Sequence, residues 1–388
     1  MADRIFWWSI LAACLIGHLG IHVAIYNRLN GFGIRRRVLK AIEYGFAFTT
    51  LLIPLAMAWV FRDALTDLVL GRPENLPIPA ILMSYGMACL LCWIVFGLPW
   101  LAWRPILGLE WVKTQRDIEV VDIRNHVDHT LPLTNKCRFA EQMPLNQIFE
   151  LSIEQIQLPV AGLPAKLDGY RLAQFSDVHL TGHIHRDFCK YVVERATEWQ
   201  PNLMALSGDI IDSHHCVDWL TDIFSGARAT DGCYFILGNH DTRIASPDET
   251  RAAMSSAGWI DVGQEPTTKR LADVESEIIG NESPWFPVAN IPRQSSAFRL
   301  LLSHSPDQFP WARKHNVHLM LAGHTHGGQG RLPLVGPILS PSFHGSRWAS
   351  GDFYKPPTTL HVSRGVCGTH LLRINCRPQL SLLTLRSA

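Results

Sequence analysis

The sequence predicts an α/β domain that follows three transmembrane helices, and three observations indicate this division. Three long stretches within the first 104 residues carry no charge. Short apolar runs recur in the remainder, and each ends at a cluster of Gly, Asp, Asn or His. An amphipathic stretch separates two of these runs, which predicts the order strand, helix, strand. We therefore expect a membrane domain over residues 1–104, a connector over 105–148 and an α/β domain over 149–388.

Composition limits the classes of protein to which this chain can belong. Of its 388 residues, 47% are hydrophobic and 18% are charged, which excludes disordered, collagenous and disulfide-rich miniproteins. The residues after Arg104 include 26 basic and 29 acidic side chains. Because phosphate neutralisation supplies most nucleic-acid affinity, this balance argues against DNA or RNA as a partner.

The uncharged stretches are long enough to cross a membrane. They run from Ile5 to Asn27, from Tyr44 to Phe61 and from Asn75 to Trp103, whereas crossing the hydrocarbon core takes about 20 residues. The predicted transmembrane helices cover about 5–27, 42–61 and 78–103. The alternative is a buried helical hairpin in a soluble protein. His18 and His22, one turn apart in the first span, indicate either an intramembrane site or a hydrogen bond between packed helices.

The charges of the two connecting loops predict the orientation. The first loop holds Arg28, Arg35, Arg36, Arg37 and Lys40, whereas the second holds Arg62 and Arg72 beside Asp63, Asp67 and Glu74. The more basic loop should be cytoplasmic, so three spans place the N-terminus outside and the α/β domain in the cytoplasm. The nine cysteines agree, because their number is odd and they show no paired framework.

The apolar runs of the α/β domain predict strands, and the polar clusters follow them. The predicted strands include Phe149–Ile153, Tyr170–Phe175, Leu203–Leu206, Cys233–Leu237, Leu300–Leu302 and Leu319–Ala322, with a helix over Asp187–Gln200 after the second. In open α/β sheets ligands bind beyond the carboxyl ends of the strands. The clusters at those ends are therefore the expected site.

Five clusters offer carboxylate, amide and imidazole ligands. In chain order they are Asp177-Val178-His179, Gly208-Asp209-Ile210-Ile211-Asp212, Gly238-Asn239-His240-Asp241, His304 and Gly323-His324-Thr325-His326-Gly327-Gly328. Alternate residues of an extended chain share a face, so Asp-x-His and His-x-His each present two ligands together. A mixed set of carboxylates and imidazoles suits Mn, Fe or Zn. No cluster is specific by itself, but five in this order predict a metal site.

These motifs resemble the signature of the calcineurin-like metallophosphoesterases, over roughly residues 165 to 388. A subset further resembles the membrane-associated bacterial branch, which includes phosphodiesterases and enzymes similar to UDP-2,3-diacylglucosamine pyrophosphatase. That subset is Ser303-His304-Ser305-Pro306-Asp307, Gly327-Gly328-Gln329, Ser363-Arg364-Gly365 and Leu383-Thr384-Leu385-Arg386. The resemblance implies a sandwich of two β-sheets flanked by helices, two divalent metal ions, with manganese expected and iron or zinc as alternatives, and a place in a bacterial inner membrane.

The resemblance also implies roles for individual residues. The first metal would be bound by Asp177, His179 and His326, the second by Asn239, His304 and His324, and Asp209 would bridge the two. Two such cations lower the pKa of a shared water and yield a hydroxide for in-line attack on phosphorus. His240 would stabilise the transition state or protonate the leaving oxygen, and Asp241 would orient its ring.

Several neighbouring residues have alternative interpretations. Asp212 is either a metal ligand or a hydrogen-bond acceptor for one. The side chains of Thr181, His183, His185, His214 and His215 are expected to be solvated rather than ligating. Five aromatic residues near the last motifs either contact acyl chains or pack in the core: Trp311, Phe343, Trp348, Phe353 and Tyr354.

The function expected from these observations is hydrolysis of a phosphodiester or pyrophosphate by a membrane-anchored enzyme, with a lipid-linked substrate such as UDP-2,3-diacylglucosamine as one candidate. The alternatives are a phosphoprotein phosphatase and a non-catalytic membrane sensor. The sequence leaves the oligomeric state open.

Overall fold

The computed structural model describes residues 1–34, 36–72 and 77–388, which form two compact units, Met1–Leu109 and Glu110–Ala388. Arg35 and Glu74, which contribute to the predicted orientation, lie outside the described residues. The first unit contains α1 (Ala2–Gly31), α2 (Arg36–Val60), α3 (Arg62–Leu70), α4 (Ala80–Cys92) and α5 (Leu98–Leu101). A π-helical turn over Trp93–Gly97 joins α4 to α5, and a second over Ala102–Ile106 follows α5.

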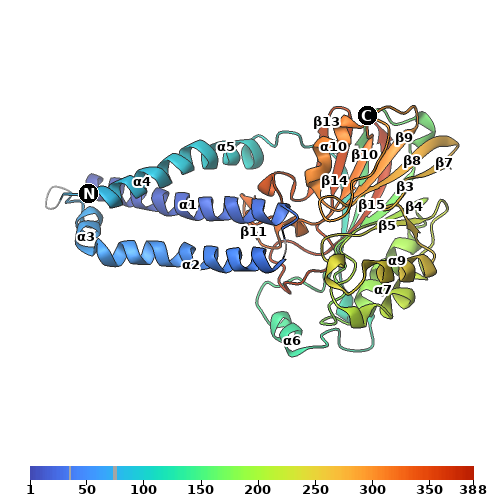
Figure 1. The fold of residues 1–388 in the computed structure, drawn as a ribbon, viewed down its shortest axis with the longest axis horizontal. Helices are drawn as coiled ribbons and strands as arrows, with labels where there is room; N and C mark the ends of the chain where they lie inside the picture. The colour runs from blue at the N-terminus through green and yellow to red at the C-terminus, as the bar shows by residue number, and fades with distance from the viewer. Residues whose placement is uncertain (35, 73–76) are drawn as a thin grey trace. The chain divides into compact units, whose positions relative to one another are not determined.

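Three helical segments among the described residues are long and apolar enough to cross a membrane (Figure 1). They cover Ala2–Gly31, Arg37–Val60 and Ala80–Leu101, which confirms the three predicted apolar helices. At most 11% of the most apolar window of each helix is buried inside the protein. Apolar surface of that extent is typical of a lipid-facing helix and contradicts the alternative of a buried hairpin in a soluble protein.

The two histidines of α1 bond to the neighbouring helices. The ring of His18 contacts the carbonyl oxygen of Thr50 at 3.0 Å and the hydroxyl group of Tyr85. His22 Nε2 lies 3.1 Å from Thr49 Oγ1, and its Nδ1 lies 2.9 Å from the carbonyl oxygen of His18. Every ring nitrogen of the pair has a partner, so the structure favours helix packing over an intramembrane binding site.

The second unit contains two mixed β-sheets. The larger has the order β1 (Gln115–Asp122), β2 (Glu150–Val160), β15 (Gln379–Ser387), β3 (Arg171–Phe175), β4 (Leu203–Ser207), β5 (Cys233–Ile236) and β6 (Ile260–Asp261). The other has the order β13 (Gly351–Lys355), β14 (Thr358–Val362), β10 (Leu319–Ala322), β9 (Phe298–Ser303), β8 (Val274–Asn281) and β7 (Thr267–Leu271). A short hairpin joins β11 (Arg331–Leu332) and β12 (Gly336–Pro337).

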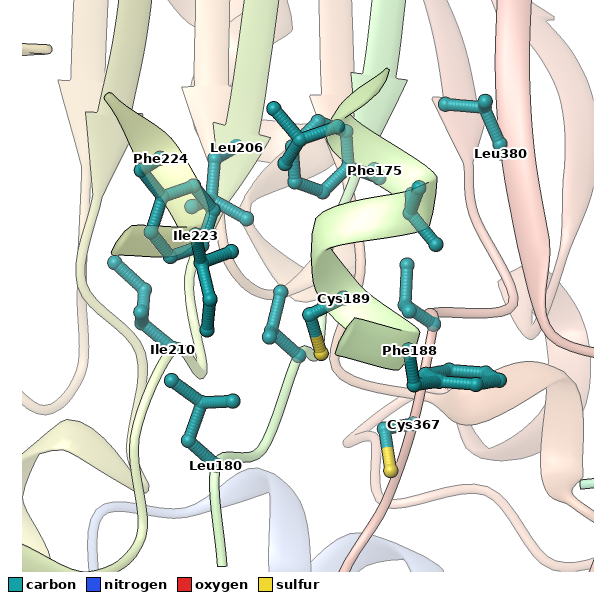
Figure 2. Close-up of a cluster of buried hydrophobic side chains, with 14 of the residues drawn as sticks. Phe175, Leu180, Phe188, Cys189, Leu206, Ile210, Ile223, Phe224, Cys367 and Leu380 are labelled. Carbon is teal, nitrogen blue, oxygen red and sulfur yellow. The ribbon is translucent and has the colours of Figure 1, made fainter. Parts of the chain in front are cut away.

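Successive side chains of each strand point to opposite faces of its sheet, so apolar residues form a core on both faces. On β3, Leu172 faces the space between the sheets, whereas Ala173 and Phe175 face α7 (Asp187–Glu198), α8 (Trp219–Phe224) and α9 (Pro247–Ser256). Figure 2 shows part of this outer layer, where Phe175 and Leu206 of the sheet lie near Phe188 and Phe224 of the helices. The opposite face of the second sheet packs on α10 (Phe309–Lys314). The predicted α/β sandwich is confirmed.

The segment predicted as a connector also forms regular structure. It contributes the edge strand β1, which pairs with β2 along its whole length, and α6 (Asn135–Glu141). Ahead of β1 the chain adds to the second sheet, because Val112 N donates to the carbonyl oxygen of Asp352 at 3.0 Å. The sequence pattern missed this strand because most of its side chains are exposed and few apolar residues mark a buried face.

Candidate metal centre

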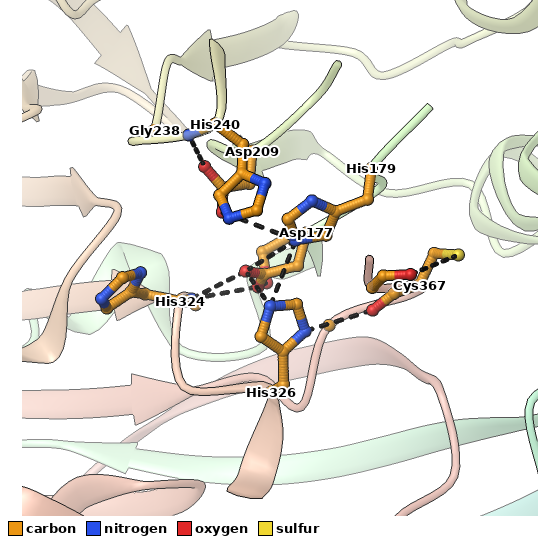
Figure 3. Close-up of polar contacts among 12 residues, drawn as sticks. Asp177, His179, Asp209, Gly238, His240, His324, His326 and Cys367 are labelled. Carbon is orange, nitrogen blue, oxygen red and sulfur yellow. Dashed lines mark hydrogen bonds and ion pairs between the residues drawn. The ribbon is translucent and has the colours of Figure 1, made fainter. Parts of the chain in front are cut away.

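The five polar clusters meet at the carboxyl ends of five strands. Asp177 and His179 follow β3, Asp209 follows β4, and Asn239 and His240 follow β5, three strands that run parallel. His304 follows β9, while His324 and His326 follow the parallel neighbour β10. Figure 3 shows Asp177 and His179, which follow a strand of the first sheet, joined by dashed lines to His326, which follows a strand of the second. All seven residues expected as ligands are thereby brought together.

Asp177, His179 and His326 form the first set of donor atoms. His179 Nε2 and His326 Nε2 lie 3.1 Å apart. Asp177 Oδ1 is 3.5 Å from His326 Nε2 and 3.9 Å from His179 Nε2. Separations of this size join the ligands of one metal ion, because metal–ligand bonds of about 2.0–2.2 Å place neighbouring ligands at about this distance.

Asn239, His304 and His324 form the second set. His304 Nε2 lies 3.1 Å from both Asn239 Oδ1 and His324 Nδ1. Asp209 connects the two sets, because its Oδ2 is 3.2 Å from His304 Nε2 and 3.5 Å from His179 Nε2. This oxygen is buried and finds no hydrogen-bond donor in the described part of the chain. A buried carboxylate oxygen without a donor fits a cation between the two sets.

Polar groups behind the imidazoles fix which ring nitrogen faces the centre. His304 Nδ1 donates to the carbonyl oxygen of Ser207 at 2.8 Å, and His326 Nδ1 donates to that of Cys367 at 3.1 Å. His179 Nδ1 donates to Asp212 Oδ2 at 2.6 Å. Each bond occupies Nδ1 and directs Nε2 inward, the nitrogen through which the ring would ligate.

The backbone of the centre is held in an unfavourable conformation. Five of the seven expected ligands adopt left-handed φ angles between 47° and 68°: Asp177, His179, Asp209, His324 and His326. Such angles cost of order 1–3 kcal/mol for residues other than glycine and are typical of functional sites. Gly238 permits the close packing, since a Cβ there would lie 2.3 Å from Asp209 Oδ1. The sharp turns aim each ligand inward at the expense of local stability.

The structure corrects the role expected for Asp241. Its carboxylate accepts hydrogen bonds from the backbone N–H groups of Ile210, Ile211 and Gly238, at 2.7–3.0 Å, and it does not contact the ring of His240. Asp212 takes the expected position, because His240 Nδ1 donates to its Oδ1 at 2.5 Å. The reason is geometric. The carboxylate of Asp241 points at the backbone N–H groups of the turns that follow β4 and β5, whereas the ring of His240 points at Asp212.

Burial and charge move the pKa values of two imidazoles in opposite directions. Burial lowers the pKa of His240 to about 4, despite its carboxylate neighbours. Burial also acts to lower the pKa of His304, but the carboxylate of Asp209 outweighs it and raises that pKa to about 9. His304 therefore lies in strongly negative surroundings, which favour a cation, and His240 is neutral near pH 7.

Three further side chains support the centre and were not predicted. The Trp285 ring lies 4.9 Å from the ring of His324 and 5.5 Å from that of His304. The fully buried Arg373 guanidinium donates to the carbonyl oxygen of His326 at 3.2 Å, and Arg243 donates to Asp212 at 2.6 Å. A lone Trp or Arg in a loop carries no sequence signal, except that Arg243 is three residues after His240.

The other side chains singled out in the sequence lie outside the seven-residue centre. His214 pairs with Glu249 at 3.3 Å, His215 with Ser213 at 2.7 Å, and Thr181 Oγ1 accepts from the backbone N–H of His183. Of the five aromatic residues, Phe353 and Trp348 are core residues, with 1% and 3% of their surface exposed, and Trp311 packs against the same core. Tyr354 is half-buried, and Phe343 is exposed.

Comparison with known proteins identifies the family. Residues 170–328 match the model of the calcineurin-like phosphoesterases. The chain is 30% identical over 239 residues to the uncharacterized metallophosphoesterase YkuE of Bacillus subtilis, an alignment that covers 58% of this chain and 82% of that protein. The chain is a calcineurin-like phosphoesterase.

Two other relatives have names that describe an activity or a membrane region. Phosphodiesterase YaeI of Escherichia coli is 28% identical over 222 residues, which cover 56% of this chain and 82% of that protein. A zebrafish protein (Danio rerio) named transmembrane protein with metallophosphoesterase domain is 24% identical over 270 residues, 61% of this chain and 57% of its own length. The protein is thus a metal-dependent phosphoester hydrolase with three apolar helices long enough to span a membrane.

Proposed function

We propose that this phosphoesterase is a membrane-anchored enzyme that uses two metal ions to cleave a phosphodiester or pyrophosphate bond. The position of Asp209 carries the proposal. Its buried Oδ2 lies 3.2 Å from one imidazole set and 3.5 Å from the other, with no donor of its own among the described residues. A carboxylate shared by two donor sets is the arrangement that holds two cations close together.

The ligand sets define which residues would hold each ion. Asp177, His179 and His326 would hold the first and Asn239, His304 and His324 the second, with Asp209 between them. When bound, the two ions supply a nucleophile at neutral pH and neutralise charge on the phosphoryl oxygens. Carboxylate, amide and imidazole ligands suit manganese, iron and zinc.

His240 is the acid–base group of the proposal. Its Nδ1 is bonded to Asp212, which fixes the ring, and its Nε2 lies 4.0 Å from Asp209 Oδ2. The side chain is 11% exposed and so borders the solvent from which a substrate enters. It can hydrogen-bond a phosphoryl oxygen or pass a proton to the leaving oxygen.

Anchorage favours a substrate at the membrane surface. Leu101 ends the third apolar helix and Glu110 begins the catalytic unit, so fewer than ten residues, at most about 35 Å of extended chain, join the two. A lipid-linked phosphodiester or pyrophosphate would share this surface and reach a high local concentration. The basic first loop supports a cytoplasmic catalytic unit, which we propose lies at the inner membrane of a bacterium.

Removing the shared carboxylate tests the two-metal proposal. Asp209→Ala and His304→Ala should each lose metal from the centre, because both leave an incomplete ligand set, and hydrolysis of a model phosphodiester should fall to near background. Metal content is measured by elemental analysis beside turnover with Mn²⁺. His214→Ala serves as the control, since His214 lies outside the centre. Full metal content and near-normal turnover in either variant would falsify the assignment.

A further inference from the structure

A second cluster of metal-ligand type lies outside the catalytic centre. Its members are His129, His185 and Asp187, which offer two imidazole nitrogens and a carboxylate. His129 Nε2 lies 3.0 Å from His185 Nδ1 and 3.3 Å from Asp187 Oδ2. His185 Nδ1 lies 3.6 Å from Asp187 Oδ1. Two imidazole nitrogens and the two oxygens of one carboxylate thus converge, although none of the three residues belongs to the motifs of the phosphoesterase.

These separations fit one tetrahedral ion. With bonds of about 2.0–2.1 Å to zinc, the ligands of a tetrahedral site lie about 3.3 Å from one another. His129 Nε2 lies close to that distance from both His185 Nδ1, at 3.0 Å, and Asp187 Oδ2, at 3.3 Å, and His185 Nδ1 lies 3.6 Å from the other oxygen of the carboxylate. The catalytic centre shows the same pattern, with imidazole nitrogens 3.1 Å apart and a carboxylate oxygen at 3.5 Å.

Within the cluster one imidazole proton lies between two acceptors. His129 Nε2 carries one proton at most while it is neutral, yet it faces both a carboxylate oxygen and His185 Nδ1. His185 Nδ1 also accepts from the backbone N–H of Asp187 at 3.3 Å, a long bond that an ion at this nitrogen would replace. One proton can serve one acceptor, whereas a cation interacts with all three. The neighbouring Arg186 does not supply the missing charge, since Asp222 pairs with it at 3.0 Å.

The backbone holds His185 in place without help from a metal and pairs its loop with the chain two residues after His129. His185 N donates to the carbonyl oxygen of Leu131 at 2.8 Å, and Leu133 N donates to that of His183 at 2.9 Å. Leu131 is buried and anchors this pairing in the core. The site is therefore preformed, and 41% exposure of the His129 side chain leaves it open to ions from solvent.

We propose that His129, His185 and Asp187 bind a third divalent ion of the zinc type, with water as the fourth ligand. Two imidazoles and one carboxylate form a ligand set that zinc accepts in a tetrahedral site. The ion clamps the loop over residues 127–134 onto the first turn of α7. Because this site shares no ligand with the catalytic centre, it binds and releases its ion independently of that centre.

Counting ions tests this site. Full-length protein in detergent is stripped with a chelator, loaded with Zn²⁺, freed of unbound metal and assayed by elemental analysis. The wild type should hold three ions per chain and His129→Ala two, with the same melting temperature for the two metal-free proteins. His214→Ala is the matched control. His214 also pairs with a carboxylate, that of Glu249, but belongs to no group of metal-ligand type among the described residues, so this variant should keep three ions.

The variant Asp209→Ala separates this proposal from the two-metal proposal. It should keep the ion at His129, and the double variant Asp209→Ala/His129→Ala should lose it. Asp187→Asn gives an independent variant at the same site and should also lose the ion. One fewer ion in the double variant than in Asp209→Ala supports the third site whatever the catalytic centre holds. Equal ion counts in these two proteins, or in the wild type and His129→Ala, overturn it.

Discussion

The carboxylate of Asp212 connects a proposed metal ligand, His179, to the proposed acid–base group, His240, with one oxygen bonded to each. Its Oδ2 accepts from His179, a proposed ligand, and its Oδ1 accepts from His240 and from Arg243. Burial acts to raise the pKa of this carboxyl, but the imidazoles of His179 and His240 outweigh it and hold that pKa far below its usual value. Asp212 is therefore ionised near neutral pH and orients both rings.

Truncation of His240 should separate catalysis from metal binding. His240→Ala should keep the metal content of the wild type, because no ligand set includes it, while kcat falls by about 10²- to 10⁴-fold, the usual contribution of an acid–base group. The measurement pairs elemental analysis with turnover of a model phosphodiester.

Asp241→Asn is the control for His240→Ala. An amide can accept fewer of the three backbone bonds, so this variant should lose about 1–3 kcal/mol of stability and retain most of its kcat once folded. A large loss of kcat at unchanged melting temperature in Asp241→Asn would return Asp241 to the catalytic role.

At the scale of elements, the segment from Glu110 to Asp122 closes one side of the sandwich. It adds to the second sheet at Val112 and then joins the first sheet as β1. Arg116 on β1 contacts Glu154 at 2.8 Å and also contacts Asp352, so one guanidinium joins both sheets. Both carboxylates are almost fully buried. Removal of Arg116 would leave Glu154 with Arg364 and Asp352 with His361, and so take one of the balancing charges from a buried network.

Arg116→Ala should destabilise the catalytic unit by roughly 3–5 kcal/mol at neutral pH. Burial opposes ionisation of Glu154 and Asp352, but Arg364, His361 and Arg116 hold both pKa values below normal. Groups with lowered pKa values add stability above their unfolded pKa of about 4, which is lost as the pH falls further. The deficit of the variant should therefore shrink below about pH 4, as thermal melts across pH will measure.

The surface pair of Arg124 provides the comparison for Arg116. Arg124 contacts Asp122 and Glu141 with 43% of its side chain exposed, so Arg124→Ala should cost less than about 1 kcal/mol. Equal effects of the two substitutions would show that Arg116 does not join the sheets energetically.

For the whole molecule, orientation decides which substrates the enzyme can meet. The first loop retains Arg28, Arg37 and Lys40 among the described residues, and the positive-inside rule predicts that this loop is cytoplasmic. A cytosolic fluorescent reporter fused after Ala388 should therefore be active, and alkaline phosphatase at the same point inactive. Fusions after Lys40 should behave like those at Ala388, and fusions after Arg72 should behave in the opposite way. Alkaline phosphatase activity at Ala388 would reverse the orientation.

Anchorage also predicts a preference for amphiphilic substrates. One phosphodiester headgroup carrying long acyl chains should give a kcat/KM about tenfold or more above the same headgroup with truncated chains in mixed micelles, since the long chains keep it at the surface. A water-soluble monoester provides the control for headgroup chemistry. Equal kcat/KM for long and truncated chains would leave a soluble phosphodiester as the substrate.

Sequence alone predicted the three apolar helices, the strand–helix–strand order and the family. These features depend on local periodicity, on span length and on motifs whose residues are contiguous in the sequence, such as Gly238-Asn239-His240-Asp241. It also predicted the seven residues that the structure brings together at the strand ends, because parallel strands end at one edge of a sheet.

Only the tertiary structure decided which acidic residue orients His240, where β1 belongs and that His129 meets His185. The turn after β5 directs Asp241 to backbone N–H groups and leaves His240 to Asp212, from another strand. The charged inner face of β1 finds its partners on β2 and β13, far away along the chain. His129 and His185 are 56 residues apart and meet through the pairing of two loops. Contacts between distant residues leave no periodic trace, because backbone turns and burial, rather than spacing, decide them.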